Sequence, residues 1–351
     1  MITSVAYAKN IDYSPNFTAE EYWKSHLIYV AHVTKTQASD TPSASVTFER
    51  TAIFLNGPPA KTTSILVTQL WSWQNDGQPL QLKIGDYVLL VEPKTNNEPI
   101  VARKIGAPDK DPLVKTLTKI AELRKSGDPK QLLENANSSD DLVSEYCLKR
   151  LLETPNVKAT QTHLGKLKAQ RDDKGRRASV RILSHRLASK LSGETNAATA
   201  EYSWLQQTIS TSKATDWQEV SPFVNRLIEF GDKRNDTAAF LTKLVKDAKV
   251  PLPVRIAAYG AFQDPRLFNF ASPDKTSELI FATCIDMLKD KQPEIRSAGA
   301  ALLHGITSRI DASKRKPFAE RAKSALQTAL KSEKNDATIH HLKTYRDLLD
   351  Q

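Results

Sequence analysis

The feature that most constrains this chain is a short pattern that recurs about every 40 residues in its C-terminal two-thirds. Residues 292–306 read QPEIRSAGAALLHGI, and residues 251–264 read PLPVRIAAYGAFQD. In both stretches a proline precedes an apolar residue and an arginine, and small residues then alternate with larger apolar ones. Looser versions occur at 140–153 and 173–187. Such a period, filled by two helices per unit, is typical of stacked helical repeats.

The spacing of the apolar anchors predicts where the less regular repeats lie. Val254 and Ile295 are 41 residues apart, whereas Gly175 and Val254 are separated by 79, about two units. We therefore expect a degenerate repeat near residues 217–230. No convincing strand pattern follows residue 105, so the rest of the chain is predicted to be helical.

The stretch QPEIRSAGAALL resembles the second helix of a HEAT repeat, and residues 128–351 resemble a HEAT/armadillo-type α-solenoid of five to six helix pairs. This resemblance implies a concave helical face that holds a partner. Small side chains let paired helices approach closely. Three alanines are accordingly expected to be packing residues, and two arginines to pair with acidic residues of the adjacent repeat. These are Ala298, Ala300, Ala301, Arg255 and Arg296.

Up to about residue 105 the apolar period is near two, and turn-forming sequences separate the segments. This pattern predicts about five strands, which suit a small closed β-barrel at residues 1–108. The expected strands are HLIYVAHVTKT, ASVTFERTAIFL, TTSILVTQLW, DYVLLVE and EPIVARK.

The order of an LNGPP turn, an ILVTQL strand and the stretch LKIGDYVLLVEP resembles OB-like barrels of the netrin/tissue-inhibitor-of-metalloproteinases type. Those inhibitors use an N-terminal cysteine, but no cysteine precedes Cys147, so protease inhibition is not implied here. The predicted fold class is α+β and multidomain. It comprises an OB-like barrel (1–108), a linking helix (109–127) and a HEAT-like α-solenoid (128–351).

Helix boundaries can also be predicted from capping chemistry. Asp111 with Pro112 is expected to begin the linking helix, and Gly127 to follow its end. Further caps and first-turn residues are expected at Asp236, Asp274 and Pro317, and at the carboxylate pairs Asp140–Asp141 and Asp172–Asp173.

The sequence contains no recognisable catalytic constellation. HExxH, GxSxG, GxGxxG and the phosphate-binding Walker loop do not occur. Two widely separated cysteines, Cys147 and Cys284, exclude a disulfide framework or a four-thiolate zinc site, and we expect both to be buried. We therefore expect no enzyme activity, no cofactor and no metal.

The net charge of +10 is concentrated in one segment. Residues 158–190 carry ten basic and two acidic side chains. If Ala178, Ile182, Leu183, Leu187 and Leu191 form the inward stripe of a helix, the polar residues left to other faces could contact phosphates or an acidic protein, or could be a solvated surface. Those candidates are Arg176, Arg177, Arg181, His185 and Arg186.

Trp71 and Trp73 form a second candidate site, because residues two apart share one face of a strand. They could line the barrel, or form a stacking surface for a sugar, peptide or base.

The favoured function is a non-enzymatic scaffold that binds a protein or peptide through the solenoid face. The alternative is nucleic-acid binding by the 158–190 patch. No stretch is apolar enough to predict a membrane span. The compartment stays open: Met1 as the true start favours the cytoplasm, whereas the small-x-small sequence Ala6-Tyr7-Ala8 fits export if an upstream signal peptide is missing.

Overall fold

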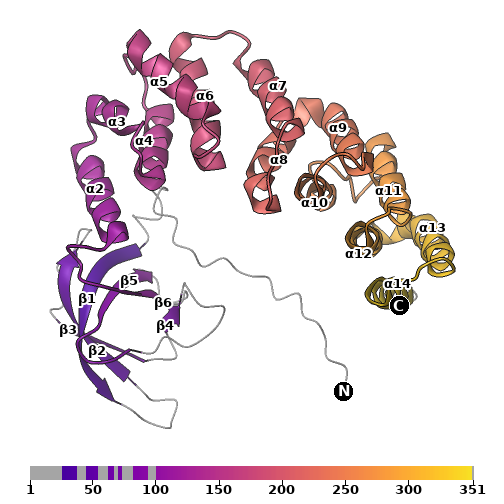
Figure 1. Ribbon diagram of the computed structural model, residues 1–351, viewed down its shortest axis with the longest axis horizontal. Coiled ribbons are helices and arrows are strands. Elements are labelled where there is room, and N and C mark those ends of the chain that lie inside the picture. Colours follow the sequence, from indigo (N-terminus) through magenta and orange to yellow (C-terminus); the bar gives the residue numbers. More distant parts are fainter. Residues whose placement is uncertain are drawn as a thin grey trace. The chain divides into compact units, whose positions relative to one another are not determined.

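The computed structural model divides into two compact units (Figure 1). The first comprises residues 1–176 and 183–193, and the second comprises residues 177–182 and 194–351. The structure describes residues 26–37, 45–53, 62–66, 70–72, 82–93 and 100–349. Along the chain, the division between the two units falls at residues 177–193, whereas the sequence predicts domain boundaries near 108 and 127.

The first unit contains a six-stranded sheet with strand order β3-β2-β1-β5-β6-β4. Neighbouring strands are antiparallel except β4 and β6, which pair in parallel, Trp71 lying opposite Val101. The strands are β1 (His26–Gln37), β2 (Ser45–Ile53), β3 (Thr62–Leu66), β4 (Leu70–Ser72), β5 (Tyr87–Pro93) and β6 (Ile100–Ile105).

The two central strands are buried on both faces. Four consecutive residues of β1, from Ile28 to Ala31, and four of β5, from Val88 to Val91, are buried. Because successive side chains of a strand point to opposite faces, burial of consecutive residues means that both faces are covered. This explains why the apolar alternation in the sequence is only partial.

The predicted strands are confirmed, with one difference. The stretch TTSILVTQLW, interpreted from sequence as one strand, contributes two strands, β3 and β4. These two form opposite edges of the sheet, and no pairing joins them within the residues that the structure describes. A closed barrel is therefore not shown by the described strands.

Helices in the first unit begin and end largely as their caps predict. Asp111 accepts hydrogen bonds from the N–H groups of Leu113 and Val114, and Gly127 follows the same helix with a φ of 62°. Asp140 caps a later helix in the same way. The helices are α2 (Pro112–Ser126), α3 (Pro129–Asn135), α4 (Asp141–Glu153), α5 (Gln161–Asp172) and the larger part of α6 (Ala178–Ser192).

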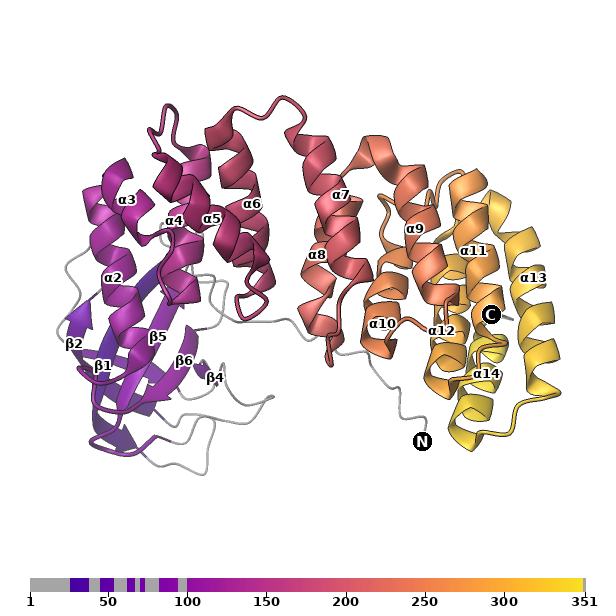
Figure 2. The same ribbon diagram turned by 45° about the horizontal axis from the view of Figure 1, so that its top comes forward.

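The second unit is built from antiparallel helix pairs in two rows (Figures 1 and 2). The outer helices are α7 (Ala197–Ser210), α9 (Arg234–Lys246), α11 (Lys275–Met287) and α13 (Ala312–Leu330). The inner helices are α8 (Ser221–Ile228), α10 (Leu252–Gly260), α12 (Pro293–Arg309) and α14 (Asp336–Leu348). The pairs lie in chain order, and α8 with its short 3-10 turn occupies the position predicted for the degenerate repeat.

One continuous apolar core runs through the second unit and joins its helix pairs. Phe262, Phe268 and Phe281 are fully buried in it. Close packing of α12 on α11 depends on Gly299, because a Cβ there would lie 2.9 Å from Cβ of Met287. Of the three alanines expected to pack, Ala300 is fully buried and the other two are half-buried.

Three boundary predictions are wrong. Asp236 lies inside the first turn of α9, which begins at Arg234. Pro317 lies within α13 because that helix begins earlier, where Asp311 accepts a hydrogen bond from the N–H of Ser313. The pair Asp172–Asp173 lies at the end of α5 and not at a helix start.

Asp274 caps α11 as predicted, by accepting from the N–H of Ser277. Among the described residues, no helix is both long and apolar enough to cross a membrane.

Candidate functional site

Two arginines at equivalent positions of successive inner helices join neighbouring repeats. Arg255 of α10 pairs with Asp290, 35 residues later, in the segment before α12. Arg296 of α12 pairs with Glu333, 37 residues later, in the segment before α14. The prediction that both arginines pair with acids of the adjacent repeat is confirmed. Because each arginine is held internally, neither is available to a ligand.

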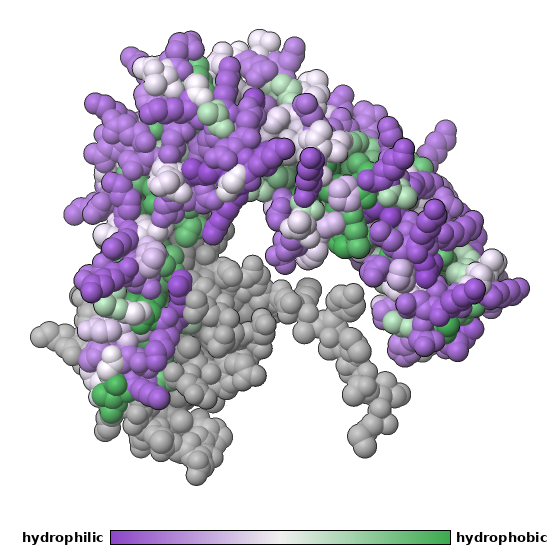
Figure 3. All heavy atoms as spheres, in the orientation of Figure 1, coloured by the Kyte–Doolittle hydropathy of each residue, from purple (hydrophilic) through white to green (hydrophobic). Residues whose placement is uncertain are grey.

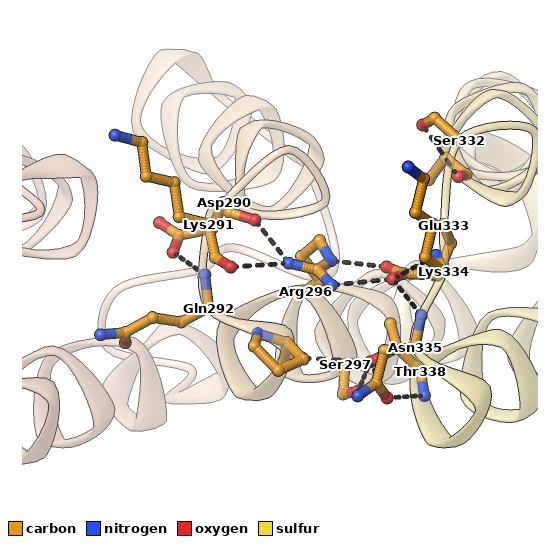
Figure 4. Close-up of polar contacts among 12 residues, drawn as sticks. Asp290, Lys291, Gln292, Arg296, Ser297, Ser332, Glu333, Lys334, Asn335 and Thr338 are labelled. Carbon is orange, nitrogen blue, oxygen red and sulfur yellow. Dashed lines mark hydrogen bonds and ion pairs between the residues drawn. The ribbon is translucent and has the colours of Figure 1, made fainter.

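Figure 4 shows the contacts around Arg296 and Glu333. The guanidinium of Arg296 donates from Nε and Nη2 to both carboxylate oxygens of Glu333, at 2.5 and 2.8 Å. Its Nη1 donates to the backbone carbonyl of Asp290 at 2.8 Å. The Asp290 carboxylate in turn accepts from Arg255 and from the N–H of Gln292. One network therefore fixes α10, α12 and the start of α14 relative to one another.

Charge pairing also sets the acidity of these carboxyl groups. The hydrogen bond from Arg296 lowers the pKa of Glu333 to about 2, despite an opposing effect of burial. Burial acts to raise the pKa of Asp290, but hydrogen bonds from Arg255 and Gln292 outweigh it and leave the pKa below its usual value. Both groups are consequently ionised at neutral pH.

Hydroxyl groups form a second set of links between repeats, with a constant offset. Thr283 of α11 donates to Thr242 of α9 at 3.4 Å, and Ser297 of α12 donates to Thr338 of α14 at 3.3 Å. In each pair the partners are 41 residues apart. The structural repeat thus has the period that the sequence pattern indicates.

The inner helices α10 and α12 present a surface without charge, which we call the inner face. It consists of eight uncharged residues that are at least partly exposed, three on α10 after Arg255 and five on α12 between Arg296 and Arg309. No acidic or basic residue apart from histidine lies on α12 between Arg296 and Arg309. The residues of the inner face are Ile256, Tyr259, Gly260, Ser297, Ala298, Ala301, His304 and Gly305.

The outer helices differ from this face in charge. Exposed positions of α9, α11 and α13 carry lysine, arginine, aspartate and glutamate, among them Lys243, Lys246, Asp286 and Glu320. Figure 3 shows hydrophilic side chains over most of the visible described surface, with apolar surface among α8 to α11. The inner face was not singled out from the sequence, although the long interval without charge between Arg296 and Arg309 could have indicated it.

The structure does not gather the basic residues predicted to form a site on α6. Arg176 is engaged internally, with its Nε 2.5 Å from Asp141 Oδ1 and its Nη2 donating to the carbonyl of Ser138. His185, predicted to lie away from the apolar stripe where it could contact a partner, is only 5% exposed and does not reach the surface in this way. The reason is that α6 is buried on more sides than the predicted apolar stripe, and Ser184 and Ser189 are buried as well.

The remaining predicted basic residues lie in two different settings. The guanidinium of Arg181 lies over the ring of Phe223, 5.0 Å from its centroid. Arg177 and Arg186 are exposed. Of the tryptophans, Trp71 lies in β4, where the structure describes its backbone alone, and Trp73 lies outside the described residues.

Reactive groups are sparse in the part of the chain that the structure covers. Cys147 and Cys284 are buried. Burial raises the pKa of the Cys147 thiol to about 12, and it also raises the pKa of the Cys284 thiol. Within the described ranges no group of three or more histidine, cysteine, aspartate or glutamate side chains is placed to hold a metal ion. The thiols are therefore structural, as predicted.

Comparison with known proteins finds a similarity to a solved structure. No family model and no curated protein matches the chain. A solved structure of an archaeal HEAT-like repeats protein from Thermococcus onnurineus NA1 is similar at 14% sequence identity, over 66% of this chain and 92% of that one, with a TM-score of 0.35. The helical-repeat architecture itself follows from the chain-ordered helix pairs and the constant 41-residue offset described above.

Proposed function

We propose that this protein is a non-enzymatic interaction scaffold that binds a protein or peptide segment along the inner face. The observation that carries the proposal is a contrast in charge: the exposed residues of α10, and those of α12 between Arg296 and Arg309, are uncharged, whereas α9, α11 and α13 expose charged ones. A solvent-facing surface that serves only solubility is normally charged. An uncharged face on stacked helices is the kind of surface that helical repeats use for partners.

The small residues of the inner face suit an extended chain. Ala298 and Ala301 are small, which lets a backbone approach α12 closely, whereas the Gln263 side chain lies over Gly305. Tyr259 and His304 add hydrogen-bonding groups at the edges of that surface. Burial lowers the pKa of His304, so its ring is neutral at pH 7 and can donate from one nitrogen while accepting at the other. A peptide backbone needs both kinds of partner.

The rigidity of the ion-pair network supports the same proposal. Because Arg255–Asp290 and Arg296–Glu333 fix the spacing of the inner helices, the inner face is pre-organised. Pre-organisation lowers the entropic cost of binding.

A matched pair of substitutions tests the proposal. Ala301 lies on the inner face and Ala282 is exposed on the outer helix α11. A photoreactive amino acid at position 301 should cross-link a protein partner that the same residue at 282 does not. With that partner purified, Ala301→Lys should weaken binding about tenfold or more, and Ala282→Lys should leave it within about twofold. Equal cross-linking at both positions, or unchanged affinity of Ala301→Lys, would refute the proposal.

For the first unit we propose that the sheet closes into an OB-like barrel. Support comes from the strand order: β3 ends at Leu66 and β4 begins at Leu70, so the two edges of the sheet are adjacent in sequence. If they act as one strand, that strand pairs antiparallel with β2 and parallel with β6, as barrel closure requires. Hydrogen exchange should then show slow amides in both β3 and β4. Rapid exchange in either strand would contradict closure.

A further inference from the structure

The ten basic residues between Lys158 and Lys190 separate into two groups in the structure. Members of the first group are engaged within the protein. Arg171 pairs with Asp172 at 2.7 Å, and Arg176 pairs with Asp141. Lys190 donates to three backbone carbonyls near the end of α4, at 2.8 to 3.1 Å. Arg181 stacks on Phe223, and Arg177 also interacts with neighbouring groups.

The second group has no such partners. Five exposed side chains, all in the first unit, form no ion pair or hydrogen bond with any residue that the structure describes. We call them the unpaired basic surface; they are Lys158, Lys166, Lys168, Lys174 and Arg186.

The acidic residues within this segment do not neutralise the unpaired basic surface. Asp172 is engaged by Arg171. Asp173 accepts from the backbone N–H of Gly175 at 2.9 Å and keeps its charge, so one carboxylate stands against five cations. The five cations therefore contribute a net positive potential on and around α5. Because they form no ion pair or hydrogen bond with the described residues, all five are available to an external anion.

We propose that the unpaired basic surface binds the phosphate backbone of a nucleic acid. The exposed residues of α5 include no large apolar side chain: they are Gln161, Thr162, Gly165, Lys166, Lys168, Ala169 and Asp172. A protein interface needs a buried apolar or aromatic centre, whereas phosphate contacts need only cationic donors. Four of the five cations are lysines, which act as point charges without the bidentate geometry of arginine, so binding is independent of base sequence.

The size of the surface sets the expected salt dependence. Helix α5 has 12 residues, about 18 Å in length, which corresponds to roughly five base pairs of duplex. With five phosphate contacts, the plot of log affinity against log salt should have a slope of about −4.5 for duplex DNA and about −3.5 for a single strand. Between 50 and 200 mM salt, the duplex affinity should then fall about 500-fold.

The experiment measures the binding of fluorescein-labelled 20-mer DNA, duplex and single-stranded, by anisotropy over this range of sodium chloride. The full-length triple variant Lys166→Glu, Lys168→Glu, Lys174→Glu should lose most of the affinity, and any residual slope should be smaller by about three units. The control Lys314→Glu, Arg315→Glu, Lys316→Glu makes the same change in net charge at the start of α13, in the other unit. It should keep the wild-type slope.

Two further measurements make the outcome decisive. Lys→Gln at the same three positions of the first unit should reduce the slope by about three units without the repulsion that glutamates introduce. Circular dichroism checks that α5 remains folded in each variant. Absence of DNA binding at 50 mM salt, equal loss in the control, or equally tight binding of poly-glutamate would each overturn the proposal. The last result would assign the surface to an acidic protein instead. None of these outcomes bears on the inner face.

Discussion

The guanidinium of Arg255 and the carboxylate of Asp290 form an ion pair between α10 and the segment that precedes α12. Arg255 is 1% exposed, and its Nε also donates to the carbonyl of Val245 at 2.9 Å. A buried cation of this kind is tolerated only where its partners satisfy it. The inner helices α10 and α12 are thereby each positioned by an acid that follows in the next repeat.

The substitution Arg255→Met should lower the free energy of unfolding by about 3–5 kcal/mol, because it leaves Asp290 without its cation in a partly buried place. Urea unfolding followed by circular dichroism measures this loss. Lys246→Met is the control, since Lys246 and Asp286 are linked across repeats in the same way but both are more than 40% exposed. The control substitution should lower the free energy of unfolding by no more than about 1 kcal/mol. Equal effects in the two variants would show that burial of the pair does not matter.

The pairing of Glu333 with Arg296 should make the free energy of unfolding depend on pH in the acidic range. The pKa of Glu333 is about 2 in the folded protein and near its ordinary value of 4.5 when unfolded. The unfolded state therefore binds the proton more readily, so the stabilisation is complete above pH 4.5 and is lost as the pH falls towards 2. In Glu333→Gln this part of the pH dependence should be absent from unfolding measured between pH 2 and 6.

Glu320→Gln provides the comparison for that pH series. Glu320 is exposed on α13 and forms no ion pair with the described residues, so its substitution should leave the curve unchanged. If Glu333→Gln lost stability between pH 6 and pH 2 as steeply as the wild type does, Glu333 would not be the group responsible for this pH dependence.

Two glycines of α12 should respond oppositely to alanine. At Gly299 the added Cβ would lie 3.0 Å from the carbonyl oxygen of Cys284, and α12 must move away from α11. We expect Gly299→Ala to lose about 1–3 kcal/mol of stability. At Gly305 the nearest atoms belong to the end of the flexible Gln263 side chain. There Gly305→Ala should be neutral or gain up to about 1 kcal/mol from helix propensity. Thermal unfolding of both variants tests this order of stability. A Gly299→Ala variant more stable than Gly305→Ala would disprove it.

The two cysteines should be unreactive in the folded protein. Both thiols are buried, and burial raises the pKa of Cys147 to about 12, so little thiolate is present at pH 8. Ellman's reagent should react slowly with native protein and should find two thiols per chain after denaturation. Leu279→Cys introduces a thiol at an exposed position of α11 and should react quickly. Rapid reaction of the unmodified native chain would show that one thiol is accessible.

Local chemistry explains which features the sequence predicted well. Neighbours within one turn or one strand decide the caps at Asp111, Asp140 and Asp274 and the strands of the first unit. The period of about 40 residues is visible because similar local patterns recur along the chain. The same reasoning failed at Pro317, because a proline fits both the first turn of a helix and a position a few residues further in.

A β-rich segment followed by stacked helix pairs could be predicted from the amino-acid sequence, because apolar spacing and backbone capping are properties of contiguous residues. The roles of the charged side chains became visible only in the folded chain. Arg176 and Lys166 look equivalent in the sequence, yet the first is engaged by Asp141, from another helix, and the second has no partner among the described residues. Partners so far apart along the chain are brought together by folding, and no local pattern encodes them.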